Sequence, residues 1–185
     1  MFQVFTGYAA AWLSPTWSDA IRTATQLYVE ANTGDVEKSV LVTQVAFELL
    51  AWTRLVQETG VISQKEWNVK SMPFSAKLRR LLGSCSIPLS IPPTLDTLQA
   101  YCVLHKLSDG AEVITNIRNA LVHPSPTKRK RLRDNPGALI QAWVLGLWYL
   151  DLVLLHICGY KGRYSNRTIT SGWRGVEVMR VPWPY

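Results

Sequence analysis

The run "NPGALIQAWVLGLWYLDLVLLHICG", residues 135–159, limits the possible folds more than any other part of the chain. Asn135 suits the N-cap of a helix, Pro136 suits its first position and Gly159 suits its end, so the run predicts one long, almost wholly apolar helix. Such a helix needs a cover over most of its surface, which either neighbouring helices or the lipid of a membrane can provide.

The same run approaches the roughly 20 apolar residues that a membrane-spanning helix requires. It holds Asp151 near its centre, however, and an acid there costs about 2.5 to 3.5 kcal/mol on insertion scales. We therefore interpret residues 142–159 as a buried core helix, and a single membrane span is the alternative. The N-terminus lacks a basic region followed by an apolar stretch and a cleavage site, so we expect no secretion.

The three cysteines, Cys85, Cys102 and Cys158, are odd in number and form no C-x-x-C pair, which predicts neither a disulfide framework nor a zinc ribbon. We expect a cytoplasmic protein without a metal or a cofactor. His105 and His156 lie on apolar helical stretches without ligand spacing, so we expect both to be satisfied core or boundary residues.

The dominant period along the chain is helical, with apolar residues three and four positions apart. Further helices are expected from about Trp17 to Asn32, from Asp35 to Gly60, near Ser63–Glu66, over residues 73–83, and as a pair over residues 94–107 and 109–123. The 185 residues fit one compact unit, so the fold class is all-α, a helical bundle with a short irregular or β-hairpin tail.

We divide the chain into three parts. Residues 1–34 are an aromatic segment, whose first dozen residues we cannot assign, and a short helix. Residues 35–167 are the helical domain, and residues 168–185 are a tail that packs on the bundle and could contain the hairpin. Trp173 and Trp183 in this tail suggest a binding surface.

The stretch "ITNIRNALVHPSPTKRKRLRD", residues 114–134, carries the candidate chemistry. On an ideal helix Asn119 and His123 lie one turn apart and can meet, whereas Arg118 lies about 140° from His123. Two copies related by a two-fold axis could present both groups to one cleft. Histidine exchanges protons near neutral pH and arginine matches phosphate oxygens, so the set suits metal-independent cleavage of RNA.

A basic tract follows this helix directly. We expect its five cations to bind an RNA backbone; they are Lys128, Arg129, Lys130, Arg131 and Arg133. The excess of 20 Lys and Arg over 13 Asp and Glu, a net charge of +7, favours a polyanionic partner as well. Basic residues are also common at the C-terminal end of a helix because they offset the helix dipole. The alternative interpretation is therefore that these cations are solvated and only cap the helix.

The string R-N-A-L-V-H, Arg118 to His123, resembles the R-x4-6-H motif of the HEPN superfamily, in which a polar residue commonly follows the arginine. The blocks "VAFELLAW", "FSAKLRRLL", "ITNIRNALVHP" and "LGLWYLDLVLLHICGYKGRYSNR" occur in an order similar to that of the C-terminal HEPN domain of ApeA-like anti-phage proteins, from Val36 to Arg167. The resemblance implies an all-α bundle that forms a homodimer and cleaves single-stranded RNA or tRNA without metal, in anti-phage defence or as a toxin.

Under this resemblance His123 is the acid or base, Arg118 holds and neutralises the scissile phosphate, and Asn119 orients the histidine or the phosphate. The alternative is a non-catalytic HEPN module that dimerises and binds nucleotide, RNA or a partner such as an antitoxin or a sensor domain. We expect Glu48 to be a buried carboxylate tied to a neighbouring helix. The segment with Tyr160, Tyr164, Asn166 and Arg167 either contacts RNA or, as we favour, ties the tail to the bundle.

Overall fold

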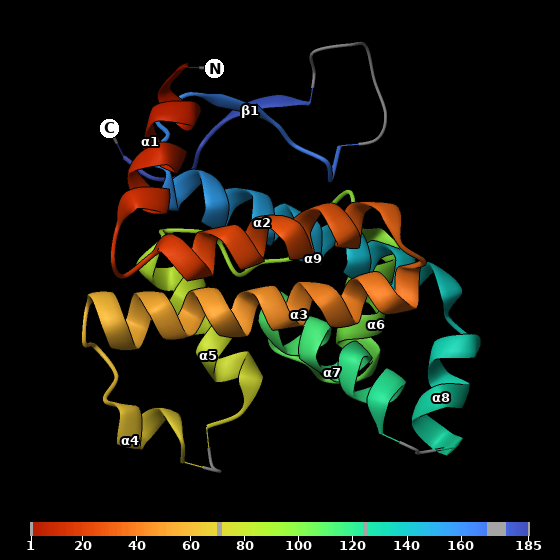
Figure 1. Cartoon of the computed structure of the whole chain (residues 1–185). Coiled ribbons are helices and arrows are strands. Elements are labelled where there is room, and N and C mark those ends of the chain that lie inside the picture. Colours follow the sequence, from red (N-terminus) through yellow and green to blue (C-terminus); the bar gives the residue numbers. More distant parts are fainter. Residues whose placement is uncertain (1, 70–71, 124–125, 170–176, 185) are drawn as a thin grey trace.

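The computed structural model describes residues 2–69, 72–123, 126–169 and 177–184 (Figure 1). It confirms the all-α class with a short strand tail. The elements are α1 (Phe2–Leu13), α2 (Ser18–Thr33), α3 (Val36–Trp52), the π-helix η1 (Thr53–Glu58), α4 (Gln64–Trp67), α5 (Phe74–Ser84), α6 (Asp96–Leu104), α7 (Gly110–Val122), α8 (Pro126–Arg133), α9 (Pro136–Ile157), β1 (Arg163–Ser165) and β2 (Val178–Arg180).

The long apolar helix α9 forms the centre of the bundle. It packs against α1, α2, α3, α6, α7 and α8, and residues 145–150 are all buried. Asn135 occupies its N-cap position, Pro136 its first turn and Gly159 follows its end with a φ of 62°, as the sequence predicts. By length and composition α9 could cross a membrane, as could Val36–Glu58, but just over half of each apolar window is buried inside the bundle.

α2 and α3 are antiparallel neighbours that cover one side of α9 (Figure 1). The expected N-cap of α3 is confirmed, because a carboxylate oxygen of Asp35 accepts a hydrogen bond from the N–H of Lys38 at 2.9 Å. The same helix continues into the wider turns of η1, where Glu58 accepts a hydrogen bond from the indole of Trp17 at 2.9 Å. The residues that the sequence left unassigned form α1, which packs on α2 and α9.

The tail is a two-stranded antiparallel ribbon in which Tyr164 pairs with Met179. Its first strand precedes residue 168, so the expectation of a hairpin confined to residues 168–185 was wrong; residues 170–176 lie outside the described part. Arg167 ties the tail to the bundle, because its guanidinium donates to both carboxylate oxygens of Asp151, at 2.6 and 3.0 Å. The same guanidinium donates to Tyr28 of α2 at 3.0 Å, while burial raises the pKa of this tyrosine to about 12.

The favoured structural interpretation of the segment before the tail is therefore confirmed. Tyr164 accepts a hydrogen bond from the indole of Trp148 at 3.0 Å, and Asn166 is buried and accepts from the Thr168 hydroxyl at 2.8 Å. Trp183 is also buried, and its indole donates to the Tyr160 carbonyl at 2.7 Å. The expected binding surface at Trp183 is thus wrong, because this side chain fills the joint between tail and bundle; Trp173 lies outside the described residues.

Candidate functional site

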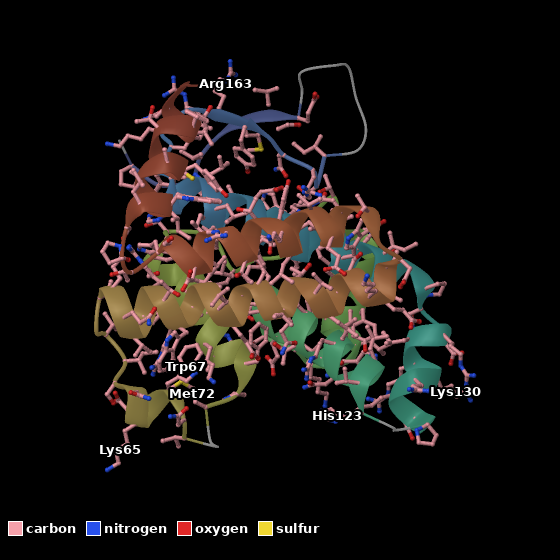
Figure 2. All side chains as sticks on the ribbon, viewed as in Figure 1. Lys65, Trp67, Met72, His123, Lys130 and Arg163 are labelled. Atoms are coloured by element: carbon pink, nitrogen blue, oxygen red, sulfur yellow. The ribbon has the colours of Figure 1, made fainter. Side chains whose placement is uncertain are left out.

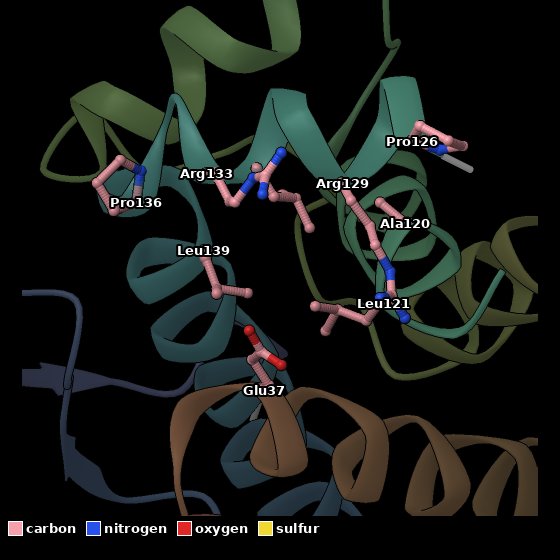
Figure 3. A pocket seen from close by; sticks show the side chains of 9 residues that line it. Glu37, Ala120, Leu121, Pro126, Arg129, Arg133, Pro136 and Leu139 are labelled. Atoms are coloured by element: carbon pink, nitrogen blue, oxygen red, sulfur yellow. The ribbon is translucent and has the colours of Figure 1, made fainter. Parts of the chain in front are cut away.

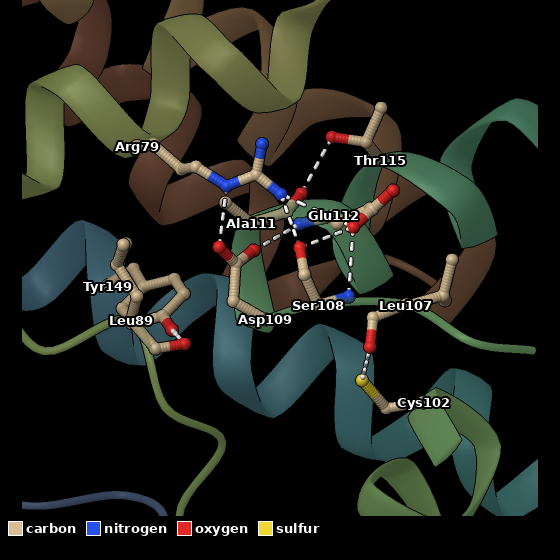
Figure 4. Close-up of polar contacts among 10 residues, drawn as sticks. All are labelled: Arg79, Leu89, Cys102, Leu107, Ser108, Asp109, Ala111, Glu112, Thr115 and Tyr149. Atoms are coloured by element: carbon tan, nitrogen blue, oxygen red, sulfur yellow. Dashed lines mark hydrogen bonds and ion pairs between the residues drawn. The ribbon is translucent and has the colours of Figure 1, made fainter.

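α7, which carries the candidate trio, begins at a hydrogen-bonded cluster around Arg79 of α5 (Figure 4). One carboxylate oxygen of Asp109 caps the helix by accepting from the N–H of Glu112 at 2.9 Å, and the other accepts from Nε of Arg79 at 2.5 Å. Arg79 also donates to the Ser108 hydroxyl at 2.7 Å and to Glu112 at 3.3 Å. Hydrogen bonds from Ser108, reinforced by Arg79, hold the pKa of Glu112 below its usual value.

One face of α7 packs into the core as the helical period predicts. Its buried residues are Gly110, Ala111, Val113, Ile114, Ile117 and Ala120. At the edge of this face Asn116 accepts a hydrogen bond from the hydroxyl of Tyr101 at 3.1 Å, which joins α7 to α6. The cluster at its beginning and this packing fix the direction in which the last turn of α7 presents its polar side chains.

Arg118, Asn119 and His123 lie at the C-terminal end of α7. The Nη1 of Arg118 donates to the side-chain oxygen of Asn119 at 3.1 Å, and both residues are partly buried. His123 is exposed and ends the helix with an extended backbone, φ −96° and ψ 127°, while its N–H donates to the Asn119 carbonyl at 3.1 Å. Among the described residues the imidazole has no hydrogen-bond or ion-pair partner, so the Asn119 amide orients Arg118 and not His123.

The basic tract forms α8, a helix that the sequence pattern did not predict. α8 packs on α7 and α9 and buries Leu132, while its lysines and arginines are exposed. Lys130 and His123 lie at the same end of the molecule, and Arg163 lies at the opposite end (Figure 2). The basic helix α8 therefore lies at the same end of the molecule as the exposed histidine.

A pocket of about 520 Å³ lies between α8, the end of α7 and the first turns of α3 and α9 (Figure 3). Its lining residues are Glu37, Ala120, Leu121, Pro126, Arg129, Leu132, Arg133, Pro136 and Leu139. Two of the five tract cations, Arg129 and Arg133, thus face a hollow. Arg118, Asn119 and His123 do not line this pocket.

Sequence reasoning missed Glu37 as a pocket residue. An acid in the first turn of a helix is common because it offsets the helix dipole, so its position alone gave no functional signal. Its place beside the basic tract depends on the packing of α3 against α9, which brings together residues about 100 positions apart. A co-varying pair of positions between α3 and α8 would have been the signal that could find it.

The remaining candidates have structural roles or none. Glu48 is exposed and accepts a hydrogen bond from Gln44 of its own helix at 3.0 Å, so the expectation of a buried carboxylate was wrong. His156 packs edge-on against Trp183 with ring centres 5.0 Å apart, as expected of a boundary residue, and burial lowers its pKa. The ring of His105 packs on Tyr101, but its buried Nε2 has no partner in the described residues.

The three cysteines are buried free thiols. Burial raises the pKa of the Cys85 thiol. Within the described ranges no group of three or more histidine, cysteine, aspartate or glutamate side chains is arranged to hold a metal ion.

The chain is similar to a known protein family and to a protein of Bacillus subtilis. A family model described as the YopA C-terminal domain matches residues 14–177. The SPbeta prophage-derived uncharacterized protein YopA of Bacillus subtilis (strain 168) is 36% identical over 172 residues, which cover 91% of this chain and 36% of that protein. The chain thus spans about a third of the length of this relative. No solved structure matches the chain.

Proposed function

The chain belongs to the YopA C-terminal domain family, and we propose that it is a metal-independent endoribonuclease of the HEPN type. The observation that carries the proposal is the end of α7, where Arg118, braced by Asn119, and the exposed His123 stand beside the basic helix α8. Its setting is anti-phage defence or a toxin system in the cytoplasm. The relative described as prophage-derived agrees with a role in conflict between phages and bacteria.

The chemistry assigns a separate task to each side chain. A neutral His123 takes the proton of a ribose 2′-hydroxyl, and the 2′-oxygen attacks phosphorus as the bond to the 5′-oxygen breaks. A protonated His123 donates its proton to the leaving 5′-oxygen. Arg118 neutralises the charge that grows on the phosphate oxygens, and the hydrogen bond from its Nη1 to Asn119 limits its rotation. The products are a 2′,3′-cyclic phosphate and a 5′-hydroxyl end.

A homodimer supplies the second histidine that this scheme needs. In one chain the single His123 would have to remove one proton and donate another on opposite sides of the phosphorus atom. A two-fold axis near the end of α7 places two copies of Arg118 and His123 around one phosphate.

The second candidate function is a non-catalytic module that binds RNA or nucleotide through the same surface. One observation favours this function: within the described chain no hydrogen bond orients the imidazole of His123. Catalytic histidines usually have such a partner, because the partner fixes which nitrogen carries the proton.

A cleavage assay in EDTA separates the two functions. Purified protein should cut single-stranded RNA or tRNA into fragments with 5′-hydroxyl ends, and His123→Ala and Arg118→Ala should each abolish the cut. Two matched controls should remain active, with folding checked by circular dichroism: Arg163→Ala at the other end of the molecule and His156→Ala in the last turn of α9. Binding without cleavage would favour the non-catalytic module, and cleavage that needs added magnesium would contradict the metal-independent scheme.

A further inference from the structure

The pocket beside α8 has oppositely charged side chains on facing walls (Figure 3). Arg129 and Arg133 are one turn apart on α8, so their guanidinium groups share one side of that helix. Glu37 extends into the pocket from α3. All three side chains are exposed, and in the described part of the chain none of them has a hydrogen-bond or ion-pair partner.

These unpaired charges limit the ligand that the pocket can hold. The arginine wall suits an anionic group such as a phosphate, and the N-terminal end of α9, where Pro136 lines the pocket, adds the positive end of a helix dipole. The carboxylate of Glu37 accepts N–H donors and repels a second anion. A ligand that matches both walls therefore carries a phosphate at one end and N–H donors at the other.

The apolar part of the lining suits a flat ring between these two ends. Leu121 and Leu139 are only partly buried and flank Glu37 in the pocket. A volume of about 520 Å³ falls within the range of small-ligand sites, roughly 300 to 1,000 Å³. A nucleotide has all three parts: a phosphate, a flat base and, on the edge of some bases, N–H donors.

The carboxylate selects among the four bases. Guanine presents two neighbouring donors on its Watson–Crick edge, N1–H and the N2 amino group, which a carboxylate can accept together. Adenine and cytosine each place an acceptor beside their amino group on that edge, and uracil has one donor between two acceptors. Glu37 therefore pairs best with guanine.

We infer that this pocket binds one guanosine nucleotide of an RNA strand, with its base on Glu37 and its phosphate between Arg129 and Arg133. The inference deepens the proposed ribonuclease function and rests on it for the identity of the ligand as RNA. Leu121 lines the pocket and lies two residues before His123 at the end of α7, so the pocket selects a base close to the cut.

Isothermal titration of the full chain with guanosine 5′-monophosphate and adenosine 5′-monophosphate tests the pocket without any cleavage. The guanosine nucleotide should bind at least about 10-fold tighter. Glu37→Gln should remove this preference, and Arg129→Ala with Arg133→Ala should weaken both nucleotides. Glu48→Gln, a matched change on the exposed side of the same helix, should alter neither, and circular dichroism checks that each variant folds.

His123→Ala separates this inference from the proposed function, because it should bind guanosine 5′-monophosphate as the unchanged protein does. Selective binding that depends on Glu37, in a chain that cuts no RNA, would support the pocket and refute the nuclease. RNA cleavage that depends on His123 while guanosine 5′-monophosphate binds no tighter than the adenosine nucleotide would overturn the pocket and keep the nuclease. An equal preference for guanosine in Glu37→Gln would also overturn the pocket.

Discussion

Glu112 accepts hydrogen bonds from both the hydroxyl and the N–H of Ser108, at 2.5 and 2.9 Å, and from Arg79 at 3.3 Å. These donors favour the ionised carboxylate and lower its pKa in the folded chain. The folded state therefore binds a proton at Glu112 less readily than the unfolded state does. Stability from this group is present above the usual pKa of 4.5 and is lost as the pH falls through the lower folded value.

Glu112→Gln should remove that part of the acid sensitivity. The urea concentration at the midpoint of unfolding is measured at pH 7 and at pH 3. It should fall less between these two pH values in the variant than in the unchanged protein. Glu48→Gln serves as the control because Glu48 lies on the exposed side of α3. An equal drop in all three proteins would contradict the role of the Ser108 and Arg79 donors.

At the residue scale the sequence predicted a candidate trio but not the contacts that its members make. A helical wheel pairs Asn119 with His123 only if the helix continues through both. A residue before a proline avoids the helical region because the proline ring crowds it, and His123 accordingly takes a ψ of 127°. The amide of Asn119 then bonds to Arg118, a contact that helix geometry alone does not predict.

Two glycines in helices should respond to alanine in opposite directions. A Cβ at Gly110 would lie 2.2 Å from the hydroxyl oxygen of Tyr149 and 3.1 Å from the carbonyl oxygen of Leu89, which accepts hydrogen bonds from both Gly110 and Tyr149. Gly110→Ala should therefore destabilise the chain by roughly 1 to 3 kcal/mol. At Gly83 of α5 nothing lies within 4 Å of such a Cβ, so Gly83→Ala should stabilise by up to about 1 kcal/mol.

Chemical unfolding of both glycine variants gives the two free-energy changes directly. The usual preference of helices for alanine over glycine would raise stability at both positions. A stabilised Gly110→Ala chain would therefore show that Tyr149 moves away at little cost and that the contact at the start of α7 is not tight.

The basic side chains of α8 are exposed, two of them line the pocket, and together they should contribute charge, not chemistry, to RNA binding. Replacing Lys128, Arg129 and Lys130 with alanine should weaken RNA binding. It should also flatten the salt dependence, by roughly one unit of log-log slope for each lost phosphate contact. Binding measured from about 50 to 200 mM salt gives the slope. A slope equal to that of the unchanged protein would mean that these cations do not contact the RNA backbone.

The helices with an apolar stripe were predictable, and α8 was not. α3, α5, α7 and α9 show apolar repeats and end signals such as Asp35, Pro136 and Gly159, which local chemistry explains. The tract "KRKRLR" has a single apolar residue, Leu132, and no stripe, so the apolar period gave no signal for a helix that packs on α7 and α9. β1 was missed for the same reason, since its partner lies beyond residue 177.

At the scale of the whole molecule, we predict that the active unit is a two-fold dimer. Specific activity per chain should then fall when the protein is diluted below its dissociation constant, and light scattering at the same concentrations should show the change from dimer to monomer. A monomer at micromolar concentration that retains full specific activity would contradict the shared site. Two His123 side chains on opposite faces of a crystallised dimer would contradict it as well.

The candidate pocket is a property of the whole molecule, because four helices from distant parts of the sequence line it. Each element was recognisable in the sequence or carried a visible charge pattern, yet nothing in local spacing placed Glu37 opposite Arg129 and Arg133. Long-range packing determines such a site, and the period of a single helix does not encode it.

The central position of α9 also affects how the chain is made. About 100 residues separate the first turn of α3 from the first turn of α9, which covers part of the apolar side of α3. A ribosome adds roughly 5 to 20 residues per second, so this part of the apolar side of α3 stays uncovered for about 5 to 20 seconds before α9 is synthesised. A nascent chain released before α9 would keep this surface exposed, so incomplete translation products should aggregate or bind chaperones, and they would lack the nucleotide pocket.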